Sequence, residues 1–375
     1  MIATTHPETS VKERPLLVAF ELSQREWKLA MTSGFGPQPW VKTIAAGDFA
    51  ALMTVLATAR TRFGLSATAP VVSCYEAGRD GFWIHRALTA HGLVNHVIDS
   101  ASIEVNRRAK RAKTDQIDAL KLVALLVRVW HGEHGAWREV RVPTVADEAA
   151  RQVSRERTAL TQERTALINQ MRSWVVTWGT GLPTKRPMGW WTTVRDWAGA
   201  PLPAELQARL ERADARLRVL LDQIAALDAA QQAAVAAAPV GSALERLVQL
   251  RGIATTSAAV LIDEGLLWRE FRNRRQVGGV LGFAPTPYAS GTMQRELGIR
   301  RAGNTRLQST MIQLAWNWVR WQPLSPITQW YQAHFGPGKR GRKIGIVAVA
   351  RKLLVALWRW ASAGILPAEA LLTPA

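Results

Sequence analysis

Four carboxylates interrupt apolar segments in the N-terminal third of the chain. Glu21 lies within the run VAFELS, and Glu76 ends the run VVSCYE. Asp115 and Asp118 are three residues apart in KTDQIDA, a spacing that places both on one face of a helix. Four acids that converge repel one another, and two divalent cations relieve that repulsion. The set is therefore typical of a two-metal site for phosphoryl transfer that takes Mg²⁺ or Mn²⁺.

Each acid also has a structural interpretation. Asp115 and Asp118 suit the positive end of a helix dipole, directly after Thr114, which is a good N-cap residue. Glu21 is equally expected in a buried ion pair, because a buried charge needs a partner. Only the whole set, in this order along the chain, favours the metal site.

The elements that must position these acids follow from hydropathy. Apolar runs predict five strands, at 16–22, 27–32, 40–45, 70–75 and 93–98. The remaining periodic segments predict three helices, at 47–62, 81–90 and 114–130. This order suits a ribonuclease-H-like α/β sheet whose first three strands form an antiparallel meander.

The rest of the chain is predicted to be helical. Residues 146–240 differ from the first domain, 1–145, in being rich in Ala, Arg, Glu, Leu and Gln around a break at 179–189. A heptad seam in the second helix of this segment consists of Leu206, Leu210, Ala213, Leu217, Leu220, Ile224 and Leu227. It indicates either an intramolecular helical hairpin or a dimerising coiled coil. A third, mainly helical domain is predicted at 241–375.

Basic residues gather at two places where they would hold a phosphate backbone. The first group directly precedes the paired aspartates and consists of Arg107, Arg108, Lys110, Arg111 and Lys113. The second lies in the third domain and consists of Arg295, Arg300, Arg301, Asn304, Arg306, Lys339, Arg340, Arg342 and Lys343. Solvated loops are the alternative interpretation, above all for the glycine-flanked run 339–343.

Gly252 and Ser290 are further candidates in the third domain. Gly252 lies in LRGIATTSAAVL, which is similar to a helix-hairpin-helix turn whose amides hold a DNA phosphate, although an ordinary helix-helix turn is an equal alternative. Ser290 precedes Gly291 after a proline-rich turn, with arginines following. A serine needs activation to act as a nucleophile, so the residues alone favour a plain turn here.

Composition limits the class of protein. The chain has 375 residues, and 48 Lys and Arg against 29 Asp and Glu give a formal charge of +19. Such an excess favours a nucleic-acid partner, with a basic solubility face as the alternative. A single cysteine, Cys74, excludes a disulfide framework and suits a reducing cytosol. We expect a cytoplasmic protein without a membrane span, because the longest apolar run, 344–360, is short and charged.

These motifs resemble the RuvC-like DEDD domain of insertion-sequence transposases of the one-ten family, the bridge-RNA-guided recombinases. The family has an acid on the first strand, a Glu after the fourth and a KTDxxDA-like motif. The matching residues here are Glu21, which replaces the usual Asp, then Glu76, Asp115 and Asp118. The family also has a C-terminal domain with SG, a GN turn and a basic helix, matched from Ser290 to Arg306.

The resemblance implies an RNA-guided DNA transposase or site-specific recombinase. Two Mg²⁺ or Mn²⁺ ions would be held by the four carboxylates, and Ser290 would be the nucleophile. DNA, a structured non-coding guide RNA and a homo-dimer or tetramer are the expected partners, at the nucleoid of a prokaryotic cytoplasm. Two alternatives remain: a metal-dependent nuclease or junction resolvase without a covalent intermediate, and a non-catalytic nucleic-acid-binding protein with a decayed site.

Overall fold

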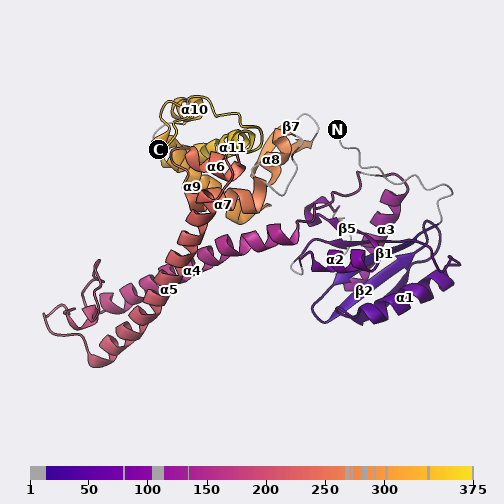
Figure 1. Ribbon diagram of the computed structural model, residues 1–375, viewed down its shortest axis with the longest axis horizontal. Coiled ribbons are helices and arrows are strands. Elements are labelled where there is room, and N and C mark those ends of the chain that lie inside the picture. The colour runs from indigo at the N-terminus through magenta and orange to yellow at the C-terminus, as the bar shows by residue number, and fades with distance from the viewer. Residues whose placement is uncertain are drawn as a thin grey trace. The chain divides into compact units, whose positions relative to one another are not determined.

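The computed structural model describes residues 14–78, 81–103, 114–133, 135–266, 271, 273–280, 282, 285–290, 293–299, 303–335 and 338–373. The chain divides into two compact units, Met1–Pro143 and Thr144–Ala375. Each unit has its own hydrophobic clusters, and Figure 1 shows the helices and strands that belong to each. Among the described residues, no helix combines the length and the apolarity that crossing a membrane requires.

The first unit contains a five-stranded mixed sheet with the strand order β3-β2-β1-β4-β5. Its strands are β1 (Leu16–Leu22), β2 (Glu26–Thr32), β3 (Trp40–Ala45), β4 (Val71–Glu76) and β5 (Val94–Ile98). The first three form an antiparallel meander, and β4 runs parallel to both β1 and β5. The five predicted strands and the meander are thus confirmed, with ends that shift by one residue in three of them.

Helices cover the two faces of this sheet. Alternate residues of β1 pack into different clusters, because successive side chains of a strand point to opposite faces. One cluster includes α1 (Phe49–Arg62) and α2 (Trp83–Ala90), and the other includes α3 (Asp115–Trp130). Thr114 caps α3 as predicted, since its hydroxyl accepts a hydrogen bond of 3.3 Å from the amide of Ile117.

The second unit begins with a long helical hairpin of α4 (Val145–Val176) and α5 (Ala204–Ala236). The two helices run antiparallel, because Arg157 pairs with Asp228 near one end and Arg209 lies over Trp174 near the other. Residues of the predicted heptad seam are buried in this hairpin: Leu210, Ala213, Leu217 and Ile224. At these positions the seam is filled from within the chain.

The connection between α4 and α5 is longer than the predicted break, 179–189. It extends to Pro203, directly before the first residue of α5. Because proline has no backbone N–H, it cannot donate the hydrogen bond that a residue inside a helix would make. The connection is also folded rather than open, because Trp190 is buried and its Nε1 donates 2.8 Å to Asp214 of α5. The folded connection therefore closes the hairpin end.

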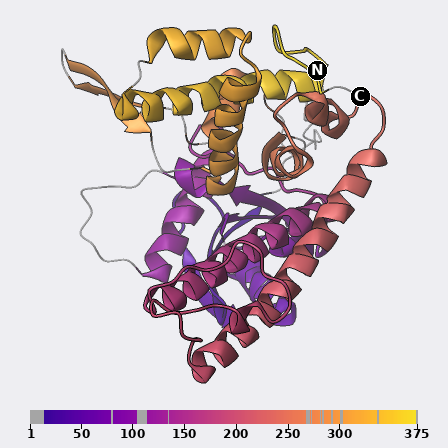
Figure 2. The same cartoon turned by 90° about the vertical axis from the view of Figure 1, so that its left-hand side faces the viewer.

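The remaining helices pack around a second core (Figure 2). They are α6 (Ala243–Gln249), α7 (Thr255–Leu261), the π-helical turn η3 (Ile262–Leu266), α8 (Arg274–Val280), α9 (Thr305–Trp321), α10 (Pro326–His334) and α11 (Lys339–Ala363). Trp318 of α9 lies at the centre of this core and is 1% exposed. It is surrounded by apolar residues of α9 and α11.

Two features of the second unit differ from the sequence predictions. A hairpin of β6 (Pro285–Ser290) and β7 (Met293–Ile299) lies in what was predicted to be a mainly helical domain. The basic run 339–343 was predicted as a loop but forms the first turns of α11, which begins after Gly338. Two residues after this run, Gly345 packs closely against Phe335, where a Cβ would lie 2.5 Å from the ring, so a larger residue would not fit there.

Candidate functional site

Glu21 and Glu76 lie on the face of the sheet that α3 covers. In β1 and β4 the residues on this face include Ala19 and Cys74, two positions before each acid. Because side chains alternate along a strand, both acids belong to the same face. The parallel register of β1 and β4 brings these two positions side by side at the carboxyl ends of the strands. The two predicted strand acids are therefore neighbours.

Asp115 and Asp118 reach this region from the first turn of α3. Lys28 of β2 is the residue opposite Glu21 in the antiparallel register, and its Nζ is 3.6 Å from a carboxylate oxygen of Asp115. The same Nζ donates 3.1 Å to Glu26, and this hydrogen bond is the largest cause of the raised pKa of Lys28. The N-terminus of α3 therefore lies over the β1–β2 part of the sheet, while Asp118 pairs with Lys121 at 2.9 Å.

The four carboxylates match the chemistry of a hard divalent cation, which prefers several oxygen ligands. They come from two adjacent strand ends and one helix start on a shared face. Within the described part of the chain, no three side chains of His, Cys, Asp or Glu are grouped closely enough to hold a metal ion. Lys28 supplies a positive charge beside Asp115.

Cys74 is a buried structural thiol on the same face. Its side chain is fully buried, and its Sγ contacts the carbonyl oxygen of Leu122 in α3 at 3.9 Å. Burial raises the pKa of the Cys74 thiol far above its ordinary value. The thiol is thus protonated and inert at neutral pH.

Ser290 is the last residue of β6 and pairs with Met293, the first residue of β7. Arg295 lies in β7, opposite Tyr288 in the register. Several predicted nucleic-acid contacts lie outside the described residues: Arg107, Arg108, Lys110, Arg111, Lys113, Arg300 and Arg301. The backbone therefore places the candidate serine at the end of a hairpin.

Other predicted contacts lie on helices or on a turn between helices. Lys339 and Arg340 begin α11, and Arg342 and Lys343 are exposed one turn later. Gly252 joins α6 to α7 with a φ of +95°, a conformation that favours glycine, and a Cβ there would lie 3.4 Å from the side chain of Trp321. The left-handed backbone conformation by itself therefore accounts for this glycine.

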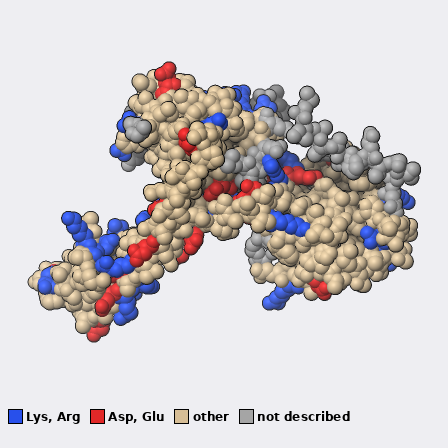
Figure 3. Space-filling model, in the orientation of Figure 1, with Lys and Arg blue, Asp and Glu red and all other residues tan. Residues whose placement is uncertain are grey.

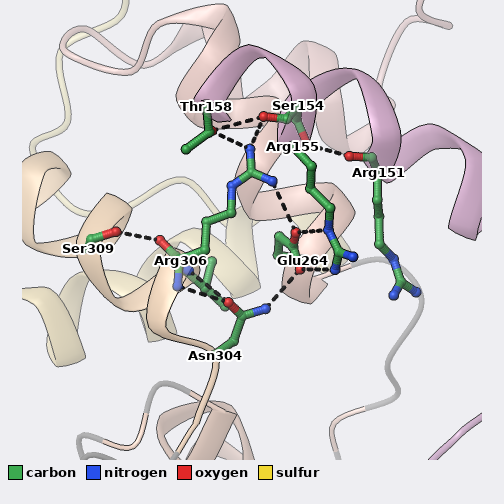
Figure 4. Close-up of polar contacts among 9 residues, drawn as sticks. Arg151, Ser154, Arg155, Thr158, Glu264, Asn304, Arg306 and Ser309 are labelled. Atoms are coloured by element: carbon green, nitrogen blue, oxygen red, sulfur yellow. Dashed lines mark hydrogen bonds and ion pairs between the residues drawn. The ribbon is translucent and has the colours of Figure 1, made fainter. Parts of the chain in front are cut away.

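The sequence analysis missed a buried acid in the second unit, Glu264 of η3, which is 3% exposed. Its carboxylate accepts hydrogen bonds of 2.8 and 3.1 Å from Arg155 of α4 and 2.9 Å from the amide of Asn304 (Figure 4). Arg306 of α9 donates to it at 3.3 Å. We call these four residues the Glu264 junction, because they join α4, η3 and α9.

The charges of the Glu264 junction are balanced by direct contacts. Burial by itself raises the pKa of Glu264, but hydrogen bonds from Arg155 and Asn304 and the nearby cations bring it below its ordinary value. Beside it, burial raises the pKa of Asp263 to about 6, against a hydrogen bond with Ser154 that lowers it. The pKa values of these two adjacent acids of η3 are therefore shifted in opposite directions.

Asn304 and Arg306 were predicted to contact nucleic acid, and the structure gives both of them partners within the protein. The side-chain oxygen of Asn304 accepts hydrogen bonds of 3.1 Å from the amides of Arg306 and Leu307, which caps α9. Arg306 also donates to the carbonyl oxygen of Ser154 and, at 2.8 Å, to the hydroxyl of Thr158. These contacts position the start of α9 against α4.

Comparison with known proteins gives the family. Residues 244–329 match the family described as Transposase IS116/IS110/IS902 family. A protein of Sinorhizobium fredii (strain NBRC 101917 / NGR234) that is named as a transposase, y4rJ, is 41% identical over 369 residues, which is 93% of this chain and 92% of the relative. A Pseudomonas aeruginosa protein named as a family 20 transposase is 30% identical over 227 residues, 59% of this chain and 65% of the relative.

These similarities define a DNA transposase. The chain belongs to the IS116/IS110/IS902 family of transposases. A second Sinorhizobium fredii protein named as a transposase, y4qE, is 24% identical over 311 residues, 77% of this chain and 74% of the relative. The family match includes three of the four residues of the Glu264 junction.

Proposed function

We propose that the chain is an RNA-guided DNA transposase that cuts and rejoins DNA with a carboxylate tetrad and a serine nucleophile. The tetrad consists of Glu21, Glu76, Asp115 and Asp118. The observation that carries the proposal is the common face of these acids at the carboxyl ends of β1 and β4 and the start of α3. The strand order, with its antiparallel meander, supports a RuvC-like assignment of the first unit.

The tetrad would hold two Mg²⁺ or Mn²⁺ ions, which supply electrostatic stabilisation of the phosphate charge during the displacement. The chain's own residues support this role. Glu21 carries the same ligand atoms as the Asp usual at that position and reaches further by one methylene. Lys28 lies 3.6 Å from Asp115 and would be displaced from it or would share the carboxylate with a metal.

Ser290 would conserve the energy of the phosphodiester. Its Oγ attacks a DNA phosphorus, a P–Oγ bond forms, and the bond from phosphorus to the leaving sugar oxygen breaks. The leaving oxygen takes up the proton that the serine gives up. Attack by the hydroxyl of another strand end reverses these changes and releases Ser290. Its backbone position, the last residue of β6 and the partner of Met293 at the end of the strand pair, is what the structure offers in support of this role.

Guide RNA and DNA would bind through the basic residues. The formal charge of +19 supports a polyanionic partner. In the second unit, the turn at Gly252 would present amides to a DNA phosphate, as in a helix-hairpin-helix element, and exposed Arg342 and Lys343 would add charge. A homo-dimer or tetramer would bring the tetrad of one protomer to the serine of another.

A metal-dependent nuclease is the second candidate, because a carboxylate site can hydrolyse DNA with water and without a serine. The two functions differ in one product. The transposase forms a covalent protein–DNA adduct, whereas the nuclease or junction resolvase leaves free nicked ends.

The test is a denaturing gel of end-labelled element DNA incubated with protein, guide RNA and Mg²⁺. Wild type should give an adduct that protease removes, and Ser290→Ala should give neither adduct nor recombined product while it still binds DNA. Removal of one oxygen at a hairpin end should change stability little. An adduct in Ser290→Ala moves the nucleophile elsewhere, and free ends alone in wild type favour the nuclease.

A further inference from the structure

The end of the α4–α5 hairpin carries an excess of positive charge. Between residues 170 and 218 there are eight Lys and Arg against four Asp and Glu. Two of the four acids are used locally: Asp214 binds Trp190 and Arg218, and Asp196 accepts hydrogen bonds from amides of its own turn. Figure 3 shows the Lys and Arg side chains gathered at this end of the hairpin.

An open groove between the two helices collects part of this charge. Gln170 and Trp174 of α4 line one side, and Arg209, Arg212 and Arg216 of α5 line the other. We call this the arm groove. The guanidinium of Arg209 lies over the ring of Trp174, 3.9 Å from its centre, and this contact fixes its direction. All three arginines are exposed.

The charge of the three arginines bears on what the arm groove can bind. In the part of the chain that the structure describes, none of them forms an ion pair with Asp or Glu. Their neighbours Leu210, Ala213 and Leu217 are buried against α4 and its connection, so the apolar seam of α5 is already filled here. A second copy of the chain would therefore find mainly charge at the arm groove, and charge of its own sign.

The spacing of the arginines suits a phosphate backbone. Positions 209, 212 and 216 share one helix face and extend over about 10 Å at 1.5 Å of rise per residue. One strand of B-DNA presents a phosphate about every 3.4 Å along its axis, so the row covers roughly three phosphates. Guanidinium groups also match the bidentate geometry of phosphate oxygens.

We propose that the arm groove binds the phosphate backbone of DNA, at a site separate from both the carboxylate tetrad and Ser290. DNA is the polyanion that a transposase must hold, and the groove offers it three exposed guanidinium groups, of which that of Arg209 is held over Trp174. The inference rests on the family assignment and on charge. It does not depend on the metal or serine chemistry proposed above.

The test is binding of a fluorescent DNA duplex of random sequence to the full chain, measured by anisotropy over a range of salt concentrations. The variant Arg209→Gln/Arg212→Gln/Arg216→Gln should bind more weakly. The slope of log affinity against log salt should become shallower by about 2.7, since each lost contact with B-DNA removes about 0.9. The assay needs no cleavage, so it is independent of the proposed catalytic mechanism.

Two further variants separate the groove from general charge and from folding. Arg25→Gln/Lys42→Gln/Arg62→Gln removes the same charge from exposed positions of the first unit and should leave the slope nearly unchanged. Arg212→Gln/Arg216→Gln keeps the Arg209–Trp174 contact, and hence the hairpin packing, and should still lower the slope by about 1.8.

An unchanged slope in both groove variants would overturn the proposal. An equal loss in the charge-matched control would overturn it too, because it would report net charge alone. A labelled RNA hairpin distinguishes the remaining source of phosphate: loss of RNA binding with unchanged DNA binding assigns the groove to RNA and rejects the DNA site.

Discussion

Lys28 is a cation that lies next to two residues of the carboxylate tetrad. It is opposite Glu21 on the neighbouring strand and lies 3.6 Å from Asp115. A cation beside these acids lowers their mutual repulsion, as bound metal ions would also do. The side chain of Asp115 is also 59% exposed, so we expect its removal to leave the fold intact.

Asp115→Ala should abolish DNA cleavage and rejoining while the melting temperature of the protein changes little. The loss of one ligand weakens metal binding, whereas the loss of one negative charge relieves repulsion in the metal-free protein. The measurements are product formation in Mg²⁺ and thermal unfolding by circular dichroism. Glu26→Gln is the matched control, because Glu26 also pairs with Lys28 but is not part of the tetrad. Full activity of Asp115→Ala would reject the two-metal site.

Asp263 makes the stability of the second unit depend on pH. Its folded pKa, about 6, is above its ordinary value of 3.8, so the folded protein holds this proton more tightly than the unfolded chain. The resulting stabilisation is complete below pH 3.8 and is lost as the pH rises through about 6. The groups that face it are Ser154, Glu264, Arg306 and Arg151.

Asp263→Asn keeps a neutral side chain at every pH and should therefore remove the loss of stability that ionisation of Asp263 causes. The unfolding free energy of the variant relative to wild type should rise between pH 4 and pH 7, as urea denaturation at each pH measures. Taking the difference cancels the titrating groups that do not interact with Asp263, whereas Glu264 interacts with it and has a lowered pKa. Parallel pH profiles for the two proteins would contradict the assigned shift.

The acids show how far the sequence predicted this site. Glu21 and Glu76 were found because each interrupts an apolar strand, and strand alternation then fixes their common face. Glu264 interrupts an apolar run in the same way, in AAVLIDEGLL, but was missed. Its partners Arg155 and Asn304 are 109 and 40 residues away, so no local spacing connects them.

At the scale of elements, regular periodicity decided what could be predicted. The five strands and α3 follow from hydropathy and one capping residue, whereas the β6–β7 hairpin does not. Prolines at 285 and 287 are typical of turns and disfavour a strand in a larger sheet, where their missing amides would break the hydrogen-bond ladder. In a two-stranded sheet both strands are edges, and prolines are tolerated there.

The Glu264 junction is the polar link between the helical hairpin and the C-terminal helices. Glu264→Gln removes the negative charge that pairs with both Arg155 and Arg306. The two arginines then lie beside each other without an acid between them, and the side chain of Arg306 is only 17% exposed. We expect a loss of about 3 kcal/mol in unfolding free energy, the lower end for a broken buried ion pair, because Arg155 is half exposed.

Urea denaturation followed by tryptophan fluorescence measures this loss. Glu163→Gln is the matched control, since Glu163 is an exposed acid of α4, the helix that carries Arg155, and its replacement should change stability by less than about 0.5 kcal/mol. An equal, small effect of both substitutions would mean that the junction contributes nothing beyond surface charge. A large effect of Glu264→Gln alone supports its role in holding α9 to α4.

At the scale of the whole molecule, the two units are stabilised separately. The clusters around β1 belong to the first unit, and those around α5 and Trp318 belong to the second. Thr144 begins α4 with a capping box that it completes with Asp147, so the second unit has its own N-terminal signal directly after Pro143. Charge, by contrast, is a property of the chain as a whole.

The formal charge of +19 should make DNA affinity fall steeply with salt. If about six to ten phosphates are neutralised, affinity should decrease by roughly three to five decades between about 50 and 200 mM salt, because bound counterions are released from the DNA. Anisotropy titrations of one duplex at several salt concentrations measure this slope. A DNA affinity that hardly changes with salt would mean that the positive charge does not contact the DNA backbone. A steep slope that the arm-groove variants reduce, but the charge-matched control does not, would locate part of the contact on α5.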